Sequence, residues 1–345
     1  MAMPLDTDNF SQRLRAGAID AERGRLLITN LAGTAQERDL TEPPNCNGFG
    51  RIRHFRRATS AGWPENPLPI DPVCRALTLP HTDALRAQAF QTAVCNWRCW
   101  YCFVPFDLLR ANRRHSAFLS PEELIELYLA QQDRPHVLDL TGGQPDLTPE
   151  WIPWMMRALR DRGLDREVYI WSDDNLSTDY FWRHLSPADV ELVASYRNYG
   201  RVACFKGFDR ESFAFNTKAA ADLFDRQFDL LGRFLDLGID LYCYVTLTTP
   251  AAASIDVGVC RFLDRLQQLD GNLPLRVVPL EIRVFTPVKA RLNVLTDTAL
   301  KHQWIAVEVW QRELERRFGE SVRTLPICDV SLKNRLGALE NAGRN

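Results

Sequence analysis

The sequence lacks the features that mark an exported or membrane-spanning chain. It contains no run of about 18 apolar residues, so it predicts no transmembrane helix. Its first residues carry neither the basic nor the apolar region of a signal peptide. A large excess of one charge is also missing: the net charge of −2 creates no overall field that would attract nucleic acid or an anionic membrane. We therefore expect a cytoplasmic protein without a membrane partner.

Cysteine is present, but not in a pattern typical of disulfides. The chain has nine cysteines, and three of them fall within the eight residues 95–102. An odd count without an export signal predicts reduced thiols. Outside this group we expect each cysteine to be a small buried apolar side chain; these are Cys46, Cys74, Cys204, Cys243, Cys260 and Cys328.

Length and proline content predict a large core with an irregular beginning. With 345 residues, 46% of them apolar, the chain can bury a sizeable core. Prolines recur through residues 43–80, so residues 1–84 are predicted to form a loop-rich N-terminal extension, with a short helix within 13–27. We expect residues 85–320 to form the core domain and residues 321–345 a C-terminal tail.

From residue 88 onward, apolar runs alternate with helical patterns in six units. Such alternation predicts an α/β fold with a parallel sheet. A full eight-unit barrel takes roughly 250 residues or more, so six units predict a partial (β/α)6 TIM-like barrel. Ser120-Pro-Glu-Glu123 is typical of a helix start. The predicted strands are 89–94, 136–140, 167–171, 201–205, 239–247 and 275–285, and predicted helices begin near 120, 148, 186, 217, 254 and 296.

Polar or glycine-rich motifs follow the first four predicted strands. They occupy residues 95–102, 142–145, 172–175 and 205–207. Parallel α/β folds place their active sites at the carboxyl ends of the strands. We therefore expect the four motifs to surround one site.

The first motif is a cysteine loop with the spacing C-x3-C-x2-C. Three thiolates in one loop can bind a soft metal or an iron–sulfur cluster. A closed structural site usually has four ligands, so three leave a position open for chemistry. The spacing alone also allows a zinc site completed by a more distant residue, the candidates being Cys74, His81 and His115.

Together the motifs resemble those of the radical S-adenosylmethionine (SAM) superfamily. The cysteine loop resembles the C-x3-C-x-aromatic-C signature of that superfamily, with Tyr101 as the aromatic residue. Residues 142–145, Gly-Gly-Gln-Pro, resemble its Gly-Gly-Glu-Pro motif, with Gln144 in place of the glutamate. The resemblance covers roughly residues 88–290, and it implies that residues 85–320 are a radical SAM core.

The resemblance implies a [4Fe–4S] cluster bound by Cys95, Cys99 and Cys102, with SAM on the iron that no cysteine binds. One electron would then cleave SAM to methionine and a 5′-deoxyadenosyl radical, which takes a hydrogen from a substrate. The enzyme would be of the oxidoreductase or lyase type, reduced by a flavodoxin- or ferredoxin-type donor. The implied SAM contacts are Tyr101 beside the adenine; the turn of Gly142, Gly143, Gln144 and Pro145; Ser172, Asp174 and Asn175 for the ribose; and Lys206 for the carboxylate.

The sequence leaves several functions open beside a reaction on a small molecule or a peptide. Cys204-Phe-Lys206 resembles the Asp-x-Lys motif of glycyl-radical-enzyme activases, with cysteine replacing the aspartate, so an activase of a partner protein is one alternative. The basic run Arg51–Arg57 predicts a solvated or ion-paired face, or an anion contact, and it keeps an RNA-modifying enzyme open. A non-catalytic metal-binding scaffold is the alternative from a different class.

No further cofactor is expected. Beyond Cys243, only Cys260 and Cys328 remain, too far apart for a second local cluster. Residues 1–84 are too short and too rich in proline for a cobalamin-binding domain.

Overall fold

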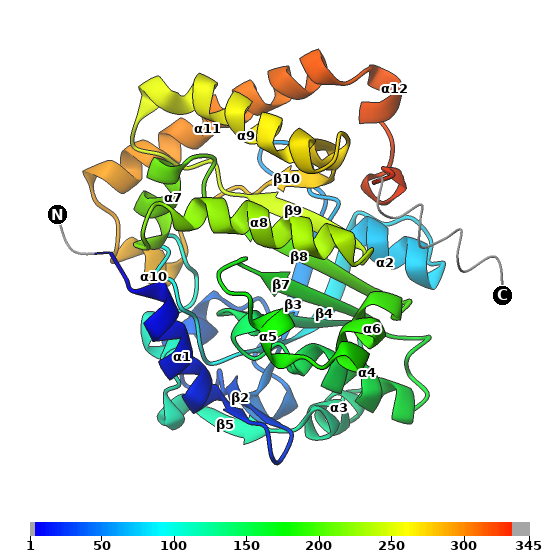
Figure 1. Cartoon of the computed structure of the whole chain (residues 1–345). Helices are drawn as coiled ribbons and strands as arrows, with labels where there is room; N and C mark the ends of the chain where they lie inside the picture. Colours follow the sequence, from blue (N-terminus) through cyan, green and yellow to red (C-terminus); the bar gives the residue numbers. More distant parts are fainter. Residues whose placement is uncertain (1–3, 333–345) are drawn as a thin grey trace.

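A seven-stranded sheet forms the centre of the protein (Figure 1). The computed structural model describes residues 4–332. Six neighbouring strands run parallel, and β3 joins the edge of the sheet antiparallel to β4. In spatial order the strands are β10 (Val277–Pro279), β9 (Leu241–Val245), β8 (Tyr199–Phe205), β7 (Tyr169–Asp174), β6 (Val137–Thr141), β4 (Ala84–Gln91) and β3 (Gly50–Arg56).

Each of the six parallel strands is followed along the chain by at least one helix. This order confirms the six predicted units and the incomplete TIM-like barrel, because parallel neighbours require a crossover connection. The helices of these units are α3 (Pro121–Leu129), α4 (Trp151–Asp161), α5 (Tyr180–His184), α6 (Pro187–Ser195), α7 (Arg210–Thr217), α8 (Leu223–Asp236), α9 (Ile255–Leu269) and α11 (Val294–Arg317).

The two faces of the sheet bury different partners. On the outer face, Leu138 and Ile170 belong to the apolar cluster that the crossover helices form. On the inner face, Trp171 packs in a second cluster with α2 (Ile70–Leu77) and the short helix η8 (Ile327–Asp329). Successive side chains of a strand point to opposite faces, so the register of each strand decides which residues reach the inside of the barrel.

Part of the predicted N-terminal extension belongs to the central sheet. β3 pairs with β4 along its whole length, from Arg56↔Ala84 to Gly50↔Phe90. The helix predicted within residues 13–27 is displaced, because α1 covers Thr7–Ala18. After it, β1 (Ile19–Asp20), β2 (Arg25–Thr29) and β5 (Ser116–Leu119) form a second, three-stranded sheet.

A segment of residues 57–69 joins the two edges of the barrel. It leaves β3 and reaches β10, where the Trp63 Nε1–H donates to the Pro279 carbonyl at 3.0 Å. The Trp63 ring also packs edge-on against Trp304 of α11, with ring centroids 5.2 Å apart. Asn66 Nδ2 donates to the Tyr244 hydroxyl of β9 at 3.2 Å. We call residues 57–69 the closing segment.

The predicted helix start at Ser120 is confirmed. The Ser120 hydroxyl accepts from the Glu123 N–H at 3.2 Å, and the Glu123 carboxylate accepts from the Ser120 N–H at 2.7 Å. The start predicted at residue 148 is too early, because the Thr148 N–H bonds to the Pro145 carbonyl at 2.9 Å and closes the short helix η5 (Pro145–Leu147). α4 begins only at Trp151.

Two other predicted boundaries differ. The helix predicted from residue 217 begins later, as α8 at Leu223, because Thr217 is the last residue of α7 and Lys218 after it adopts a left-handed φ of 65°. The last strand is much shorter than the predicted 275–285. Its neighbour β9 ends at Val245, so the chain beyond Leu280 has no further strand to pair with.

The C-terminal region completes the barrel. α10 (Thr286–Lys289) precedes α11, and α12 (Glu320–Arg323) and η8 follow it. Residues 333–345 of the predicted tail lie outside the described residues. Within residues 4–332, none of the helices combines the length and the apolar composition that a membrane crossing requires.

Replacing Trp63 tests whether the closing segment holds the barrel together. Trp63→Ala should lower the free energy of unfolding by about 3–5 kcal/mol, because it empties a buried site and removes a hydrogen bond. Trp63→Phe keeps most of the ring packing and should cost only about 0.5–1.5 kcal/mol for the lost hydrogen bond. Urea denaturation followed by circular dichroism measures both. Equal midpoints for Trp63→Ala and the native chain would show that the segment does not stabilise the barrel.

Candidate active site

The cysteine loop leaves the central sheet at the end of β4. After Gln91 the chain turns toward β2, where the Ala93 N–H donates to the Leu27 carbonyl at 3.1 Å. The Cys95 N–H then bonds to the Leu109 carbonyl at 3.2 Å, and the Cys102 N–H to the Cys99 carbonyl at 3.0 Å. The loop therefore starts at the carboxyl end of the first parallel strand, as predicted.

Asn216 at the end of α7 ties the cysteine loop to the neighbouring strands. Its carbonyl accepts from the Trp100 N–H at 3.1 Å, and its side-chain oxygen accepts from the Trp100 indole at 2.9 Å. Its Nδ2 donates to the Lys206 carbonyl at 2.8 Å and to the Thr248 carbonyl at 3.1 Å. One buried amide thus fixes the loop against the ends of β8 and β9.

The three thiols of the loop are removed from water. Cys95 and Cys99 are buried and Cys102 is half-buried. Burial raises the pKa of all three thiols, that of Cys99 to about 12, although the charge of Lys206 works in the other direction. Arg291 braces the same loop by donating to the Cys102 carbonyl at 2.6 Å. Buried thiols of this kind become thiolates when a metal compensates their charge.

The turn of residues 142–145 packs directly on the loop. Gly142 and Gly143 both have left-handed φ values, 73° and 61°. A Cβ on Gly143 would lie 2.1 Å from the Val94 carbonyl oxygen, and one on Gly142 would lie 2.3 Å from Cγ of Gln91. The Gln144 N–H also donates to the Val94 carbonyl at 2.8 Å. Only glycines allow the turn to lie this close to the residue before Cys95.

The Gln144 side chain connects the ends of β6 and β7. Its Nε2 donates to Asp174 Oδ1 at 2.7 Å, and its Oε1 accepts from the Asn175 N–H at 2.9 Å. A carboxylate at this position could accept from Asn175 but could not donate to Asp174. The glutamine therefore fits its carboxylate neighbour, which gives a physical reason for this departure from the Gly-Gly-Glu-Pro motif.

Arg201 of β8 joins two buried carboxylates in the same network. Its Nη2 contacts Asp174 Oδ2 at 2.7 Å and also pairs with Asp146 in η5. The three side chains are at most 1% exposed. Burial raises the pKa of Asp146 to about 7, although the Arg201 guanidinium opposes this. The strand ends that carry residues 142–145 and 172–175 are thus locked together.

Three of the predicted SAM contacts lie near the cysteine loop. Asn175 Nδ2 is 3.9 Å from Cys95 Sγ and 3.5 Å from the Gly143 carbonyl oxygen. The Tyr101 hydroxyl is 3.0 Å from Thr246 Oγ1, beyond the end of β9. Burial works against the Lys206 charge, but the neighbouring thiols of Cys204, Cys99 and Cys95 outweigh it and raise the pKa of Lys206.

The two other predicted ribose contacts point away from the inner face. Ser172 is buried and its hydroxyl lies 2.8 Å from the Tyr199 hydroxyl. Both oxygens of Asp174 are taken, by Gln144, Arg201 and the Leu176 N–H. Between them Asp173 faces the inside, where its carboxylate accepts from Thr141 and lies 3.5 Å from Arg53.

The inner face also carries charged residues that were not predicted as a group. Arg53 Nη1 donates to Asp139 Oδ2 at 2.9 Å, and Arg51 precedes it on the same face of β3. Burial raises the pKa of Asp139 to about 6, and the Arg53 charge opposes this. The sequence signal was the basic run Arg51–Arg57, which predicted a solvated or ion-paired face or an anion contact but not the inner face of the sheet.

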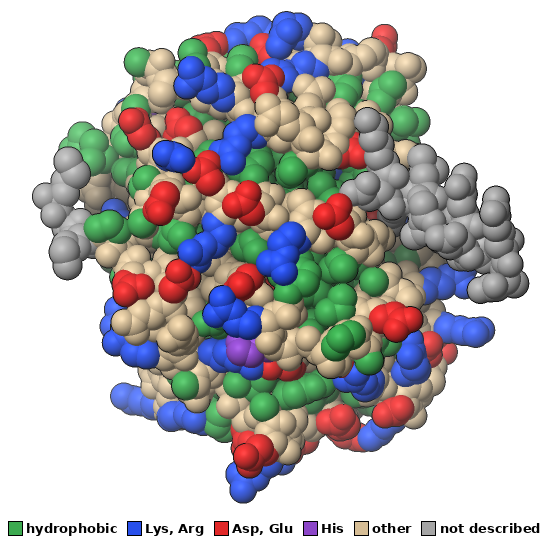
Figure 2. Space-filling view, viewed as in Figure 1, with side chains coloured by type: hydrophobic (Ala, Val, Ile, Leu, Met, Phe, Trp, Pro, Cys, Tyr) green, Lys and Arg blue, Asp and Glu red, His purple; other side chains and the backbone are tan. Residues whose placement is uncertain are grey.

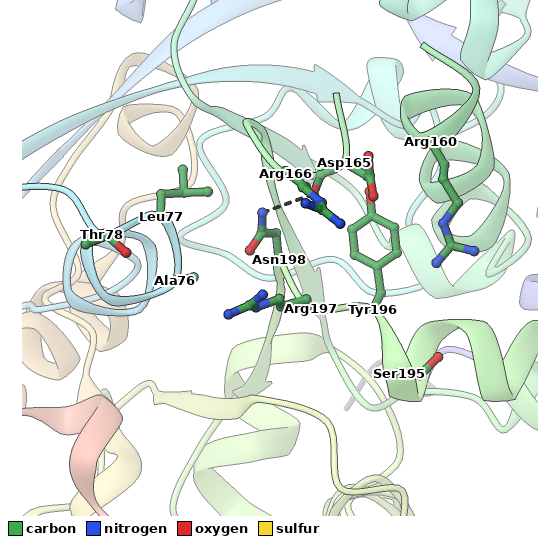
Figure 3. A pocket seen from close by; sticks show the side chains of 10 residues that line it. All are labelled: Ala76, Leu77, Thr78, Arg160, Asp165, Arg166, Ser195, Tyr196, Arg197 and Asn198. Carbon is green, nitrogen blue, oxygen red and sulfur yellow. Dashed lines mark hydrogen bonds between the residues drawn. The ribbon is translucent and has the colours of Figure 1, made fainter. Parts of the chain in front are cut away.

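A separate cavity of about 430 Å³ lies at the opposite end of the sheet (Figure 3). It is lined by residues that precede β7 and β8, such as Asp165 and Tyr196, and by the end of α2. Asn198 Nδ2 donates to the Asp165 carbonyl there at 3.0 Å. Among the described residues that line it, none belongs to the four predicted motifs. This cavity is distinct from the site at the strand ends.

The positions of the side chains give no support to a closed zinc site. Cys74 and His81 line another cavity of about 660 Å³, together with Trp310 of α11. Throughout residues 4–332, no three His, Cys, Asp or Glu side chains are grouped so that they could hold one metal ion. The three cysteines of the loop are themselves not grouped in this way, so the described residues contain no closed site for a single metal ion.

Residues 91–249 match the family model described as the Radical SAM superfamily. The matched segment runs from the last residue of β4, through the cysteine loop, to the residues after β9. It covers just under half of the chain. Residues 91–249 therefore form a radical SAM superfamily domain.

Comparison with solved structures gave weaker similarities. SuiB of Streptococcus suis bound to S-adenosylmethionine is 18% identical, with 51% of this chain and 37% of that chain covered and a TM-score of 0.36. SuiB bound to the precursor peptide SuiA is 16% identical, with 51% and 36% covered and a TM-score of 0.36. The match thus spans well under half of the SuiB chain. None of the curated proteins matches this chain.

Gln144→Glu tests the link between the two strand ends. The new carboxylate would lose the bond to Asp174 and would face a second carboxylate. We therefore expect the free energy of unfolding to fall by about 1–3 kcal/mol relative to the native chain. Gln132→Glu, on the exposed side of the molecule, is the matched control and should change stability by no more than about 0.5 kcal/mol. Guanidinium denaturation measures both, and equal losses in the two variants would contradict the role of Gln144.

Arg201→Ala tests the buried ion network. It leaves Asp146 and Asp174 without their cation, so we expect a loss of about 3–5 kcal/mol at neutral pH. Without the guanidinium, the folded-state pKa of Asp146 rises further above its unfolded value. The loss of stability should therefore grow as the pH rises and shrink as the pH falls and the Asp146 carboxyl is protonated.

The exposed pair of Arg157 and Asp189 supplies the control for Arg201→Ala. Arg157→Ala should cost no more than about 1 kcal/mol and show little dependence on pH. Denaturation at several pH values between 5 and 8 measures both variants. A pH-independent loss in Arg201→Ala would contradict the assignment of buried carboxylates as its cause.

Proposed function

We propose that this protein is a radical SAM enzyme that binds a [4Fe–4S] cluster through Cys95, Cys99 and Cys102 and cleaves SAM reductively. The observation that carries the proposal is the contact between the cysteine loop and the turn of residues 142–145, within a radical SAM superfamily domain. Two motifs far apart in sequence thus meet at one edge of the sheet.

The donor set fits an iron–sulfur cluster. Each cysteine of such a cluster binds a different iron, so the three thiols need not converge on a single metal position. Their burial disfavours free thiolates, and the nearby cations of Arg98 and Lys206 favour the negative charge that a thiolate-bound cluster carries. A cluster with three protein ligands leaves one iron for SAM.

The residues around the loop can be assigned to parts of SAM. Lys206 supplies a cation for the carboxylate; no hydrogen bond or ion pair of its ammonium group is found within the described chain. Gly142 and Gly143 let the backbone approach the methionine part, and Tyr101 supports the adenine. Asp173 and Asn175 are better ribose contacts than Ser172 and Asp174, since Asp173 Oδ1 is buried without a hydrogen-bond partner among the described residues.

When bound, the cluster and SAM would supply one-electron cleavage of the bond between sulfur and C5′ of SAM, which would give methionine and a 5′-deoxyadenosyl radical able to take hydrogen from the substrate. Apolar side chains of the inner face, such as Trp171, would limit the access of water to that step. A flavodoxin- or ferredoxin-type protein is the proposed electron donor. The overall reaction is of the oxidoreductase or lyase type.

The alternatives differ in their support. Arg51, Arg53 and Arg57 do not form a solvated basic surface: Arg51 is buried, Arg53 binds Asp139 and Arg57 binds Asp71. On the face that Figure 2 draws, acidic and basic side chains are interspersed. These three arginines therefore give no support to an RNA substrate. An activase of a partner protein remains an alternative through Lys206, and a non-catalytic scaffold remains the alternative of a different class.

Cys99→Ala tests the proposal. The native chain, reconstituted anaerobically with iron and sulfide, should bind about four irons and release 5′-deoxyadenosine from SAM with dithionite. Cys99→Ala should lose at least about a hundredfold of that release, because one ligand of the cluster is gone. Chromatography with mass spectrometry measures 5′-deoxyadenosine and methionine.

Cys260→Ala in α9 is the matched control, since this cysteine lies outside the loop, and it should keep the iron content and the SAM cleavage. If the native chain binds no cluster after reconstitution, or binds one but releases no 5′-deoxyadenosine, the enzyme proposal fails. If Cys99→Ala changes only stability and not turnover, the scaffold alternative is favoured.

A further inference from the structure

Arg51 of β3 is a buried cation, and one edge of its guanidinium has no hydrogen-bond partner among the described residues. Only 6% of the residue is exposed, and its Nε and Nη2 atoms are out of contact with solvent and unpaired within residues 4–332. Buried polar groups are nearly always hydrogen-bonded, so an unpaired guanidinium edge in a native protein requires an explanation. A ligand that binds there supplies one.

Each acidic group near Arg51 has one oxygen beside the neighbouring Arg53, while Asp139 Oδ1 and Asp173 Oδ1 are unpaired within residues 4–332. Arg53 Nη1 lies 2.9 Å from Asp139 Oδ2 and 3.5 Å from Asp173 Oδ2. Burial lowers the pKa of Arg51 to about 10, and the Arg53 charge adds to this effect, so Arg51 stays cationic at neutral pH. The two arginines and two aspartates leave this part of the inner face without an excess of negative charge. The positive charge of Lys206 lies on the same inner side.

Arg51 stands next to the cysteine loop. Its guanidinium carbon is 5.4 Å from the centre of the Phe103 ring, and Phe103 follows Cys102 directly. The inner face here is reached by solvent, since the side chains of Arg53 and Asp173 keep 27% and 23% exposure. An anion bound to Arg51 would therefore lie inside the barrel beside the proposed cluster.

The unpaired atoms are arranged to bind an anion through two parallel hydrogen bonds. Nε and Nη2 form one edge of the guanidinium, and their two N–H groups can bind both oxygens of a carboxylate or phosphate. We infer that Arg51 binds a carboxylate or phosphate group of the substrate, which makes the substrate of this enzyme an anionic molecule. This inference rests on the proposed function, because it places the anion beside the cluster.

The position on β3 favours the substrate over SAM as the source of the anion. Lys206, at the end of β8, is the cation among the predicted SAM contacts. Arg51 lies on β3, and the strands β4, β6 and β7 separate β3 from β8 in the sheet. β3 also lies outside residues 91–249, the part of the chain that matches the superfamily. The strand adds a cation to the barrel that the superfamily domain itself does not contain.

Inorganic phosphate and acetate are the probes for this site. The melting temperature of the full chain is measured in phosphate, in acetate and in chloride at equal ionic strength. At a phosphate concentration about tenfold above the dissociation constant, the melting temperature of the native chain should rise by about 2–3 °C. Arg51→Met should lose this rise and, in chloride, should melt no lower than the native chain, because it removes a buried charge that no protein group binds.

Arg56→Met is the matched control, since Arg56 is the exposed arginine of the same strand. It should keep the phosphate-dependent rise. If Arg51→Met does not fold, Arg51→Lys makes the same test, because lysine keeps the charge but not the two-pronged edge and should weaken the response. A rise that persists in Arg51→Met, or no rise in the native chain, overturns the inference.

A separate measurement distinguishes the substrate from SAM. Equilibrium dialysis of SAM with the reconstituted protein should give the same affinity for Arg51→Met and Arg56→Met. A loss of about tenfold or more in Arg51→Met alone would assign the unpaired edge of Arg51 to the SAM carboxylate and overturn the substrate assignment. The phosphate response needs no cluster, so its failure and a failure of SAM cleavage are observed independently.

Discussion

One buried guanidinium, that of Arg201, holds the strand ends of the site in place. It sits between Asp146 and Asp174, where no water reaches the three charges. Two carboxylates that share one cation in such an environment have little freedom to move, since any separation exposes an uncompensated charge. Gln144 extends the constraint from Asp174 to the turn that packs on Val94. The ion network on the outer side of the sheet thus helps to fix the position of the cysteine loop.

The sequence was sufficient for the repeated part of the fold. Six apolar runs, each followed by a helical pattern, predicted the six parallel strands, and the Ser120 capping box marked a helix start correctly. The residues after each strand were also informative, because parallel strands bring their carboxyl ends to one edge. Strand ends with cysteine, glycine and amide residues could therefore be assigned to one site before their distances were known.

What the sequence could not give is the side of the sheet that each residue faces. A shift of one position exchanges inner and outer residues, and in β7 it is Asp173, not Ser172 or Asp174, that turns inward. The same ambiguity concealed β3, whose inward positions Arg51 and Arg53 are polar although the strand is part of the central sheet. Arg53 pairs with carboxylates from β6 and β7, and such long-range pairing leaves no local pattern.

The closing segment also governs the route into the barrel. It spans the gap between β3 and β10, and α2 with η8 fills the amino-terminal end of the inner face, so among the described elements the passage lies where the strands end. A substrate of the proposed enzyme would therefore have to reach the cysteine loop from the carboxyl ends of the strands.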